Sequence, residues 1–118
     1  VVEATRHPGF AQGTLVQGLF GCQQRVISDG SDLLVLPDIA PLPVTAHFSL
    51  LGHIGMTAYC GLVKVGAAKA GETLLVSGAA GAVGALVGQI GRILGCRVVG
   101  VAGGAEKCRY LTEVLGFD

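Results

Sequence analysis

The segment best suited to chemistry is a glycine-rich stretch at residues 77–84, which reads SGAAGAVG. Aligned to the dinucleotide-binding pattern G-x-G-x-x-G, its key positions are Ala79, Gly81 and Gly84, so alanine replaces the first glycine. Gly81 would let the backbone approach a pyrophosphate, and Gly84 would let the following helix pack closely against its strand. A helix that starts near Ala82 would point unpaired N–H groups at that anion. The alternative is a tight turn in a glycine-rich α/β protein.

The residues after the next apolar run indicate which dinucleotide would bind. NAD enzymes place Asp or Glu at the end of the second strand to bond the ribose hydroxyls, but residues 101–105 read VAGGA. Small residues leave room for a 2′-phosphate, and Lys107 supplies a cation in the first turn of the next helix. Arg109 is a second candidate cation, while Glu106 is the competing observation. The pattern favours NADP(H) over NAD(H); the alternative for Lys107 alone is a solvated surface lysine.

The motifs of several other kinds of functional site are absent from the sequence. No Gly-Lys-Ser/Thr follows the glycine-rich segment, which argues against a triphosphate site, and no Gly-x-Ser-x-Gly supports acyl transfer. A methyltransferase is disfavoured because that fold usually has an acid after its second strand. The four cysteines and three histidines show no zinc-ligand spacing, so no metal site is predicted. The thiols are expected to be reduced and mostly buried, and a structural role for His53 is favoured over general acid catalysis.

The elements that would position these residues follow from the apolar pattern. Residues 73–77 and 97–102 are typical of buried parallel strands. Helices are expected at residues 82–94 and 105–115, each closely followed by a glycine. This order predicts a right-handed βαβ unit plus one helix, the start of a doubly wound parallel sheet. Two short helices are expected before it, at residues 44–51 and 56–65.

Glycines continue along the first of the two later helices, at Gly88, Gly91 and Gly95. Further phosphate contacts are one interpretation. Close packing of the helix on its sheet is favoured, because the free N–H groups of a helix lie at its start.

The first third of the chain has a different character. Short apolar runs at residues 14–16, 25–27 and 33–36 are separated by glycine and proline turns, which is typical of a β-meander. Residues 37–43 contain three prolines and predict a stiff connector. The sequence therefore predicts two domains, at residues 1–43 and 44–118.

The composition excludes some partners. Lysine plus arginine and aspartate plus glutamate both number 8, so no basic balance supports nucleic-acid binding. Two uncharged stretches, residues 40–63 and 73–91, are interrupted by prolines, histidines or glycines and do not predict a membrane span. The start of the chain has no signal-peptide pattern, so a cytoplasmic location is expected. Charged residues make up 14% against roughly 25% in soluble domains, which is interpreted as a sign of truncation.

Four segments carry a resemblance to a known family: residues 55–59 (GMTAY), 71–73 (GET), 79–84 (AAGAVG) and 103–107 (GGAEK). Together, and in this order, they resemble the zinc-independent medium-chain dehydrogenases/reductases, in particular the NADPH-dependent enone reductases. That branch includes prostaglandin/leukotriene, alkenal and curcumin reductases. The resemblance implies that the first domain is the β-rich end of a GroES-like substrate domain. The second would be the N-terminal part of a Rossmann NADP-binding domain, both being incomplete.

The resemblance also implies roles for individual residues. Thr57, at the start of its helix, would lie near the nicotinamide, and Leu19 and Phe20 would approach the substrate. Lys107 would contact the 2′-phosphate. The implied cofactor-binding residues are Gly81, Ala82, Val83, Gly84, Thr57, Gly104 and Lys107.

The implied reaction is hydride transfer from NADPH to the β-carbon of an α,β-unsaturated ketone or aldehyde, in a cytoplasmic homodimer that binds no zinc. The chain departs from the family at His53-Ile54, where Met-Pro is common, and at Cys22, where bacterial relatives often have an aromatic residue. Family members are much longer, and the tyrosine usually assigned to the enolate lies outside this chain. The 118 residues alone are therefore expected to be inactive. The alternative function is a non-catalytic dinucleotide-binding or interaction module that uses the same phosphate loop and an exposed sheet edge.

Overall fold

The computed structural model describes all 118 residues, Val1–Asp118. The chain divides into two compact units, Val1–Pro43 and Val44–Asp118. No helix combines the length and the apolar character that crossing a membrane requires.

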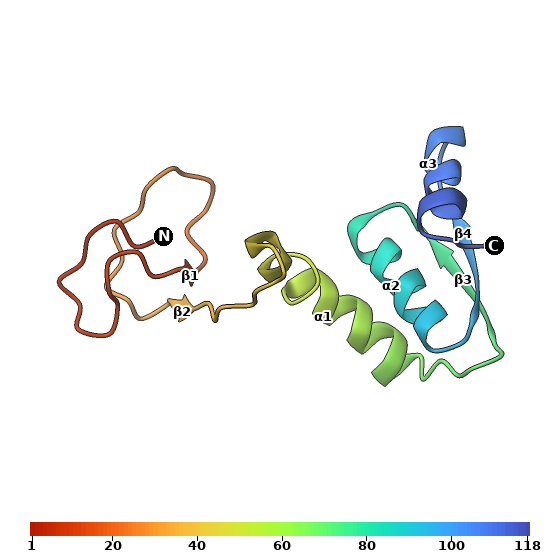
Figure 1. Ribbon diagram of the computed structural model, residues 1–118, viewed down its shortest axis with the longest axis horizontal. Helices are drawn as coiled ribbons and strands as arrows, with labels where there is room; N and C mark the ends of the chain where they lie inside the picture. Colours follow the sequence, from red (N-terminus) through yellow and green to blue (C-terminus); the bar gives the residue numbers. More distant parts are fainter. The chain divides into compact units, whose positions relative to one another are not determined.

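The first unit has little regular structure. Its strands β1 (Val16–Gln17) and β2 (Leu34–Val35) pair antiparallel over two residues each. The strand predicted at residues 25–27 is absent, which corrects that expectation. Val26 is half exposed and Ile27 is fully exposed, so this run has neither a neighbouring strand nor a core to pack against. The chain instead forms loops, drawn in red to orange in Figure 1.

One loop of the first unit is organised by Asp29. Its carboxylate accepts hydrogen bonds from the backbone N–H of Ser31 at 3.0 Å and from the Ser31 hydroxyl at 2.7 Å. These bonds favour the ionised carboxylate and lower the pKa of Asp29 from its ordinary value.

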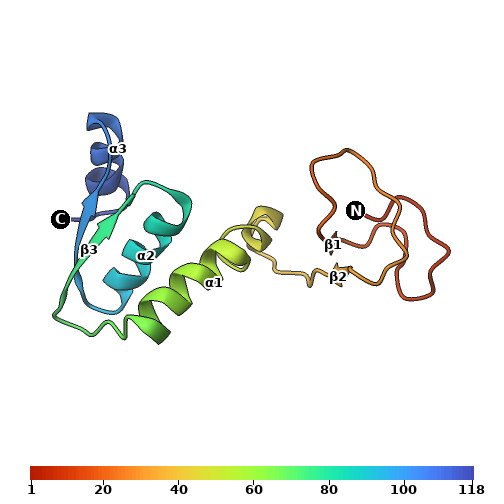
Figure 2. The ribbon, with the colours of Figure 1, turned by 180° about the vertical axis from the view of Figure 1, so that it is seen from behind.

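The second unit is built on two parallel strands. Strand β3 (Thr73–Ser77) pairs with β4 (Arg97–Val101), with Thr73 opposite Arg97 and Ser77 opposite Val101. Helix α2 (Ala82–Ile93) connects them, so β3, α2 and β4 form the predicted βαβ unit. Figure 1 and Figure 2 both show α2 lying against one side of this strand pair. The strand and helix boundaries agree with the sequence prediction within one residue.

The two helical segments before this unit differ from the prediction in length. Helix α1 (His53–Tyr59) continues as a π-helix, η2 (Cys60–Val65), and therefore starts three residues before the expected Met56. Its N-cap is Gly52, which has no side chain to form a capping hydrogen bond, so no capping residue marks the start of this helix. The helix expected at residues 44–51 is only the short 3₁₀ helix η1 (Val44–His47).

The last helix is close to the prediction. It consists of α3 (Ala105–Arg109), followed directly by the π-helix η3 (Tyr110–Val114). Gly116 then adopts a left-handed conformation with φ of 66°, as expected of a residue just beyond a helix C-terminus.

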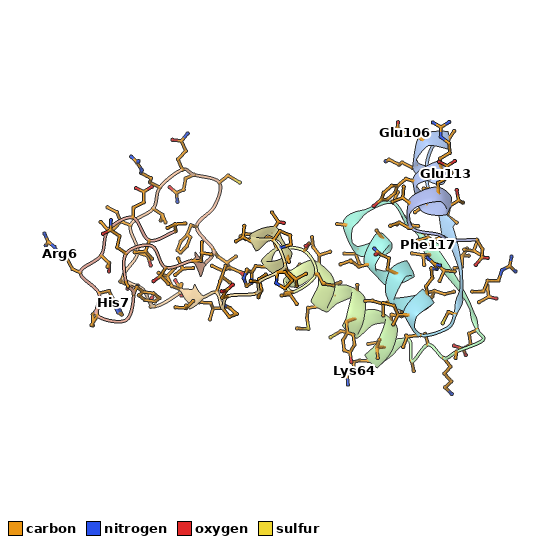
Figure 3. The ribbon with its side chains drawn as sticks, in the orientation of Figure 1. Arg6, His7, Lys64, Glu106, Glu113 and Phe117 are labelled. Atoms are coloured by element: carbon orange, nitrogen blue, oxygen red, sulfur yellow. The ribbon has the colours of Figure 1, made fainter.

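The core of the second unit lies between the strand pair and the helices α2 and η3. Val98 and Ala79 are fully buried, and Phe117, labelled in Figure 3, is 5% exposed. The remaining buried members of this core are Val76, Cys96, Leu111 and Leu115.

Two glycines of α2 fit against this core. A Cβ added at Gly88 would lie 2.1 Å from the Phe117 ring, and one at Gly91 would lie 2.6 Å from the Leu74 side chain. The predicted packing of the helix on its sheet is therefore confirmed for Gly91, since Leu74 and Val98 belong to β3 and β4, whereas Gly88 packs against Phe117, which follows η3. Gly95 instead ends the helix in a left-handed conformation with φ of 85°.

The expectation that the cysteines are mostly buried is wrong. All four are free thiols, but only Cys96 is buried, and Cys60 is half-buried. Cys22 is exposed in a loop of the first unit, and Cys108 is exposed on α3. The histidines, cysteines and acidic residues form no group of three or more that could hold a metal ion.

Candidate functional site

The glycine-rich segment forms a tight turn between β3 and α2. Gly78 has a left-handed conformation with φ of 58°, and the Gly81 N–H donates to the Gly78 carbonyl at 2.9 Å. Because the residue at the first motif position is Ala79, the conformational freedom needed for the turn is supplied one position earlier. The three-position motif does not predict this role of Gly78, although a glycine directly after a buried strand is a recognisable signal for it.

The turn is fastened to the neighbouring strand. Ala79 is completely buried, and its N–H donates to the carbonyl of Val101 at 3.0 Å. Val101 is the last residue of β4. The turn is therefore held over the carboxyl end of the sheet.

Three backbone N–H groups at the start of α2 have no hydrogen-bond partner. Gly81 is the N-cap and provides no side-chain cap, and the first amide to bond back to the turn is that of Ala85, which donates to the Gly81 carbonyl. The amides of Ala82, Val83 and Gly84 precede it. Free N–H groups and the positive end of the helix dipole together form a site for an anion.

Gly84 permits the close approach of the turn to this helix. A Cβ added there would lie 2.5 Å from the Gly78 carbonyl oxygen and 2.9 Å from the Ala79 Cα. Both are backbone atoms and cannot rotate away. The close contact of Gly84 is thus with the turn itself, whereas the motif predicted contact with the strand.

An open cleft of about 440 Å³ lies beside the turn. Its walls come from β3, the turn and the first half of α2, and most of them are apolar side chains or bare backbone. The lining residues are Leu75, Val76, Ser77, Gly78, Gly81, Val83, Gly84 and Val87. An elongated ligand with an anionic group could lie along these walls and reach the free amides.

A second turn leaves the sheet at the same edge. Because β3 and β4 are parallel and Ser77 lies opposite Val101, the segments that follow them start side by side. Gly104 is the N-cap of α3, with φ of 90°, and a Cβ on it would meet no atom within 4 Å. The register therefore brings the predicted residues of the two turns to one sheet edge.

Lys107 follows on α3 and is exposed. The chain contains one ion pair, between Arg25 and Glu3, so Lys107 has no carboxylate partner. Arg109 and Glu106 are exposed on the same helix; Glu106 is labelled in Figure 3. Small residues and an unpaired lysine can accommodate a phosphate group, which an acidic side chain at the end of β4 would repel.

The remaining predicted residues lie elsewhere. Thr57 is the fifth residue of α1 rather than its start, and its hydroxyl donates to the His53 carbonyl at 2.7 Å. Leu19 and Phe20 belong to the first unit, just after β1, where Leu19 is fully exposed and the Phe20 ring packs over Gly18. The site described by geometry therefore contains the residues of the two turns, and the roles of these three residues stay predictions.

No family model matches the chain. It is 55% identical over 118 residues to the NADPH-dependent curcumin reductase of Escherichia coli (strain K12), covering all of this chain and 34% of that protein. It is 48% identical over 120 residues to prostaglandin reductase 1 of Mus musculus, again covering the whole chain and 36% of the relative.

A solved structure of a related protein has the same fold over nearly the whole chain. The crystal structure of CurA in complex with NADPH from Vibrio vulnificus superposes with a TM-score of 0.87 at 45% identity, covering 98% of this chain and 34% of that one. The chain thus spans about a third of the length of the proteins it matches. These findings confirm the resemblance to NADPH-dependent reductases of the medium-chain dehydrogenase/reductase type.

Proposed function

We propose that this chain is part of an NADPH-dependent oxidoreductase that reduces the carbon–carbon double bond of an α,β-unsaturated ketone or aldehyde. The observation that carries the proposal is the sheet edge where the anchored turn and its three free amides lie beside a second turn, which leads into the helix of the unpaired Lys107. The names of the relatives support the choice of cofactor and substrate class, since they include an NADPH-dependent curcumin reductase and a prostaglandin reductase.

The residues present suit a phosphorylated dinucleotide. The pyrophosphate would accept hydrogen bonds from the amides of residues 81–84, that is Gly81, Ala82, Val83 and Gly84, of which the last three have no other partner. The absence of side chains at Gly81 and Gly84 leaves the backbone accessible. Lys107 would pair with the 2′-phosphate beside the open space at Gly104.

When bound, NADPH would supply the hydride that reduces the β-carbon of the enone. The part played by this chain is to bind and orient the dinucleotide, so that its reactive end is presented in one geometry. Thr57 is proposed to lie near the nicotinamide, and Leu19 and Phe20 near the substrate. These three assignments rest on the family resemblance.

The same resemblance supports several proposals about the whole protein. Residues 1–43 would be the end of a GroES-like substrate domain and residues 44–118 the start of a Rossmann domain. The enzyme would use no zinc and would be a cytoplasmic homodimer that acts on a small unsaturated carbonyl compound. The 118 residues alone would lack turnover, because the tyrosine that the family uses for the enolate is not among them.

The test is oxidation of NADPH by the intact protein in the presence of a simple conjugated enone. We expect turnover with the enone, none with the corresponding saturated ketone, and a strong preference for NADPH over NADH. Absence of turnover together with protection against thermal unfolding by NADPH would favour the alternative, a dinucleotide-binding module without catalysis. Turnover by the isolated 118-residue chain would contradict its proposed inactivity.

A further inference from the structure

The turn after β3 rests on β4 through a pair of small residues, Ala79 and Gly100. Gly100 lies in β4, one residue before the Val101 carbonyl that accepts the Ala79 N–H. A Cβ added at Gly100 would lie 3.0 Å from the Cβ of Ala79. Glycine weakens the interior of a strand, and its presence there often marks a close approach of another segment. In this protein the approaching segment is the turn beside the proposed cofactor site.

Ala79 cannot move aside by itself. Its Cβ has no torsion that could displace it, and its backbone is held by the 3.0 Å hydrogen bond to Val101. The other atoms close to an added Cβ are Leu111 Cδ1 at 2.8 Å and Phe117 Cδ2 at 3.0 Å. Leu111 Cδ1 is the end of a rotatable side chain and can move away from an added Cβ. The remaining steric conflict of a larger residue at position 100 is therefore with the turn and with the Phe117 ring.

We propose that Gly100 is a positioning residue for the cofactor turn. By leaving room for the Ala79 methyl group, it lets residues 78–81 lie close on the carboxyl end of the sheet. The amides of residues 82–84 follow directly, so their direction depends on the height of the turn above β4. The ligand of these amides rests on the proposed function, whereas the placement of the turn is a property of the chain itself.

The matched pair of variants is Gly100→Ala and Gly91→Ala. Gly91 packs against Leu74 and Val98 in the same core, where a Cβ would lie 2.6 Å from Leu74, but it does not contact the turn. Both variants are expected to lower the melting temperature. Only Gly100→Ala is expected to weaken NADPH binding, by about tenfold, since a displacement of a few tenths of an ångström misaligns the amides.

Two further measurements separate positioning from general loss of structure. Adenosine 2′-monophosphate, which carries the 2′-phosphate but no pyrophosphate, should bind the unmodified protein and Gly100→Ala equally well. Adding Ala79→Gly to Gly100→Ala should restore NADPH affinity, because it removes the methyl group that the new Cβ displaces. If Gly100→Ala does not fold, the double variant still decides the question by folding and binding NADPH or by failing to.

The inference is overturned if Gly100→Ala and Gly91→Ala weaken NADPH binding equally, or if Ala79→Gly restores nothing. Amide NMR signals of residues 82–84, recorded in the intact protein without nucleotide, test the same displacement independently of any ligand. They should shift in Gly100→Ala and return in the double variant. If these shifts occur but the unmodified protein binds no NADPH, the proposed function fails while the positioning role of Gly100 stands.

Discussion

At the scale of single residues, the glycines of the candidate site are needed for two different physical reasons. Gly78 and Gly104 adopt left-handed conformations, with φ of 58° and 90°, which other residues adopt only at a cost. Gly84 has ordinary helical geometry and is needed because the turn backbone lies against it. The first kind allows the chain to change direction, and the second brings the amides of α2 close to the strand end.

A substitution at Gly84 tests the second reason. Gly84→Ala places a Cβ 2.5 Å from the Gly78 carbonyl oxygen, so the turn must move away from the helix. We expect NADPH affinity to fall by about tenfold or more, measured by fluorescence titration in the intact protein. The control is Gly61→Ala in η2, where an added Cβ meets no atom within 4 Å. That variant should bind normally and be as stable or slightly more stable, since alanine favours helix by about 1 kcal/mol over glycine.

Lys107 tests the choice between the two nicotinamide dinucleotides. A charged hydrogen bond contributes about 1.5–3 kcal/mol, so Lys107→Ala should weaken NADPH binding by about 10- to 100-fold. NADH lacks the 2′-phosphate, and its affinity should not change. Arg109→Ala distinguishes the second candidate cation, and Lys64→Ala, an exposed lysine of η2 labelled in Figure 3, serves as the control. A Lys107→Ala protein that kept its preference for NADPH would contradict the assignment.

At the scale of elements, residues 115–118 connect α2, β4 and η3 through hydrogen bonds. The Arg92 guanidinium donates to the Leu115 carbonyl at 2.6 Å, and the Phe117 N–H donates to the Leu111 carbonyl at 2.9 Å. The Asp118 N–H then donates to the Val98 carbonyl at 2.7 Å. Phe117 therefore enters the core between Gly88 and Gly100. Of its two neighbours in the chain, Gly116 has a left-handed conformation and Asp118 is hydrogen-bonded to β4.

Removing the Phe117 ring should destabilise this arrangement strongly. Phe117 is 5% exposed, and truncating a buried phenylalanine to alanine typically costs about 3–5 kcal/mol. We expect Phe117→Ala to lose about that much stability in urea-induced unfolding. Val114→Ala is the control, because Val114 on η3 is 68% exposed, and an exposed change of this kind alters stability by less than about 0.5 kcal/mol. Equal losses in the two variants would show that Phe117 is not a core residue.

The elements that could be predicted from the sequence are those whose signals are local. The predicted strands at residues 73–77 and 97–102 and the helix between them follow from apolar runs bounded by glycines, and the structure has all three within one residue of those positions. The start of α1 could not be predicted, because its N-cap is Gly52 and carries no capping side chain. The run at residues 25–27 looks like a strand but has no partner, and pairing depends on distant parts of the chain.

The candidate site, too, could be predicted only where its signals are local in the sequence. Gly81 and Gly84 were identified from their spacing, whereas the fit of Ala79 against Gly100 depends on how the turn lies on another strand. Such a contact leaves no spacing pattern in the sequence. A glycine inside a strand indicates that some segment comes close, but it does not indicate which one.

At the scale of the whole molecule, the two compact units differ in how much structure they contain. Val44–Asp118 holds the parallel strands, all of the longer helices and both turns of the candidate site. Val1–Pro43 has two strands of two residues. The surface is also apolar in places: Leu75 of β3 and Val101 of β4 are 68% and 52% exposed. This matches the low share of charged residues, 14%.

Because the proposed site lies within the second unit, the effect of NADPH should be confined to it. A ligand at 100 times its dissociation constant stabilises the state that binds it by about 2.7 kcal/mol. In hydrogen exchange on the intact protein, we expect NADPH to slow exchange at residues 77–87 and 101–109. Residues 1–36 should be unchanged by NADPH alone, since none of the proposed cofactor contacts is among them.

Adding the saturated ketone product to the NADP⁺ complex extends this prediction to the first unit. If Leu19 and Phe20 contact the substrate as proposed, exchange at residues 18–21 should slow only when both ligands are present. Residues 6–10 form a matched control loop of the same unit, where His7 and Phe10 pack with ring centroids 5.0 Å apart; their exchange should not change. Slowing at residues 6–10 as well would indicate a general tightening of the unit, and unchanged exchange at residues 18–21 would remove Leu19 and Phe20 from the substrate site.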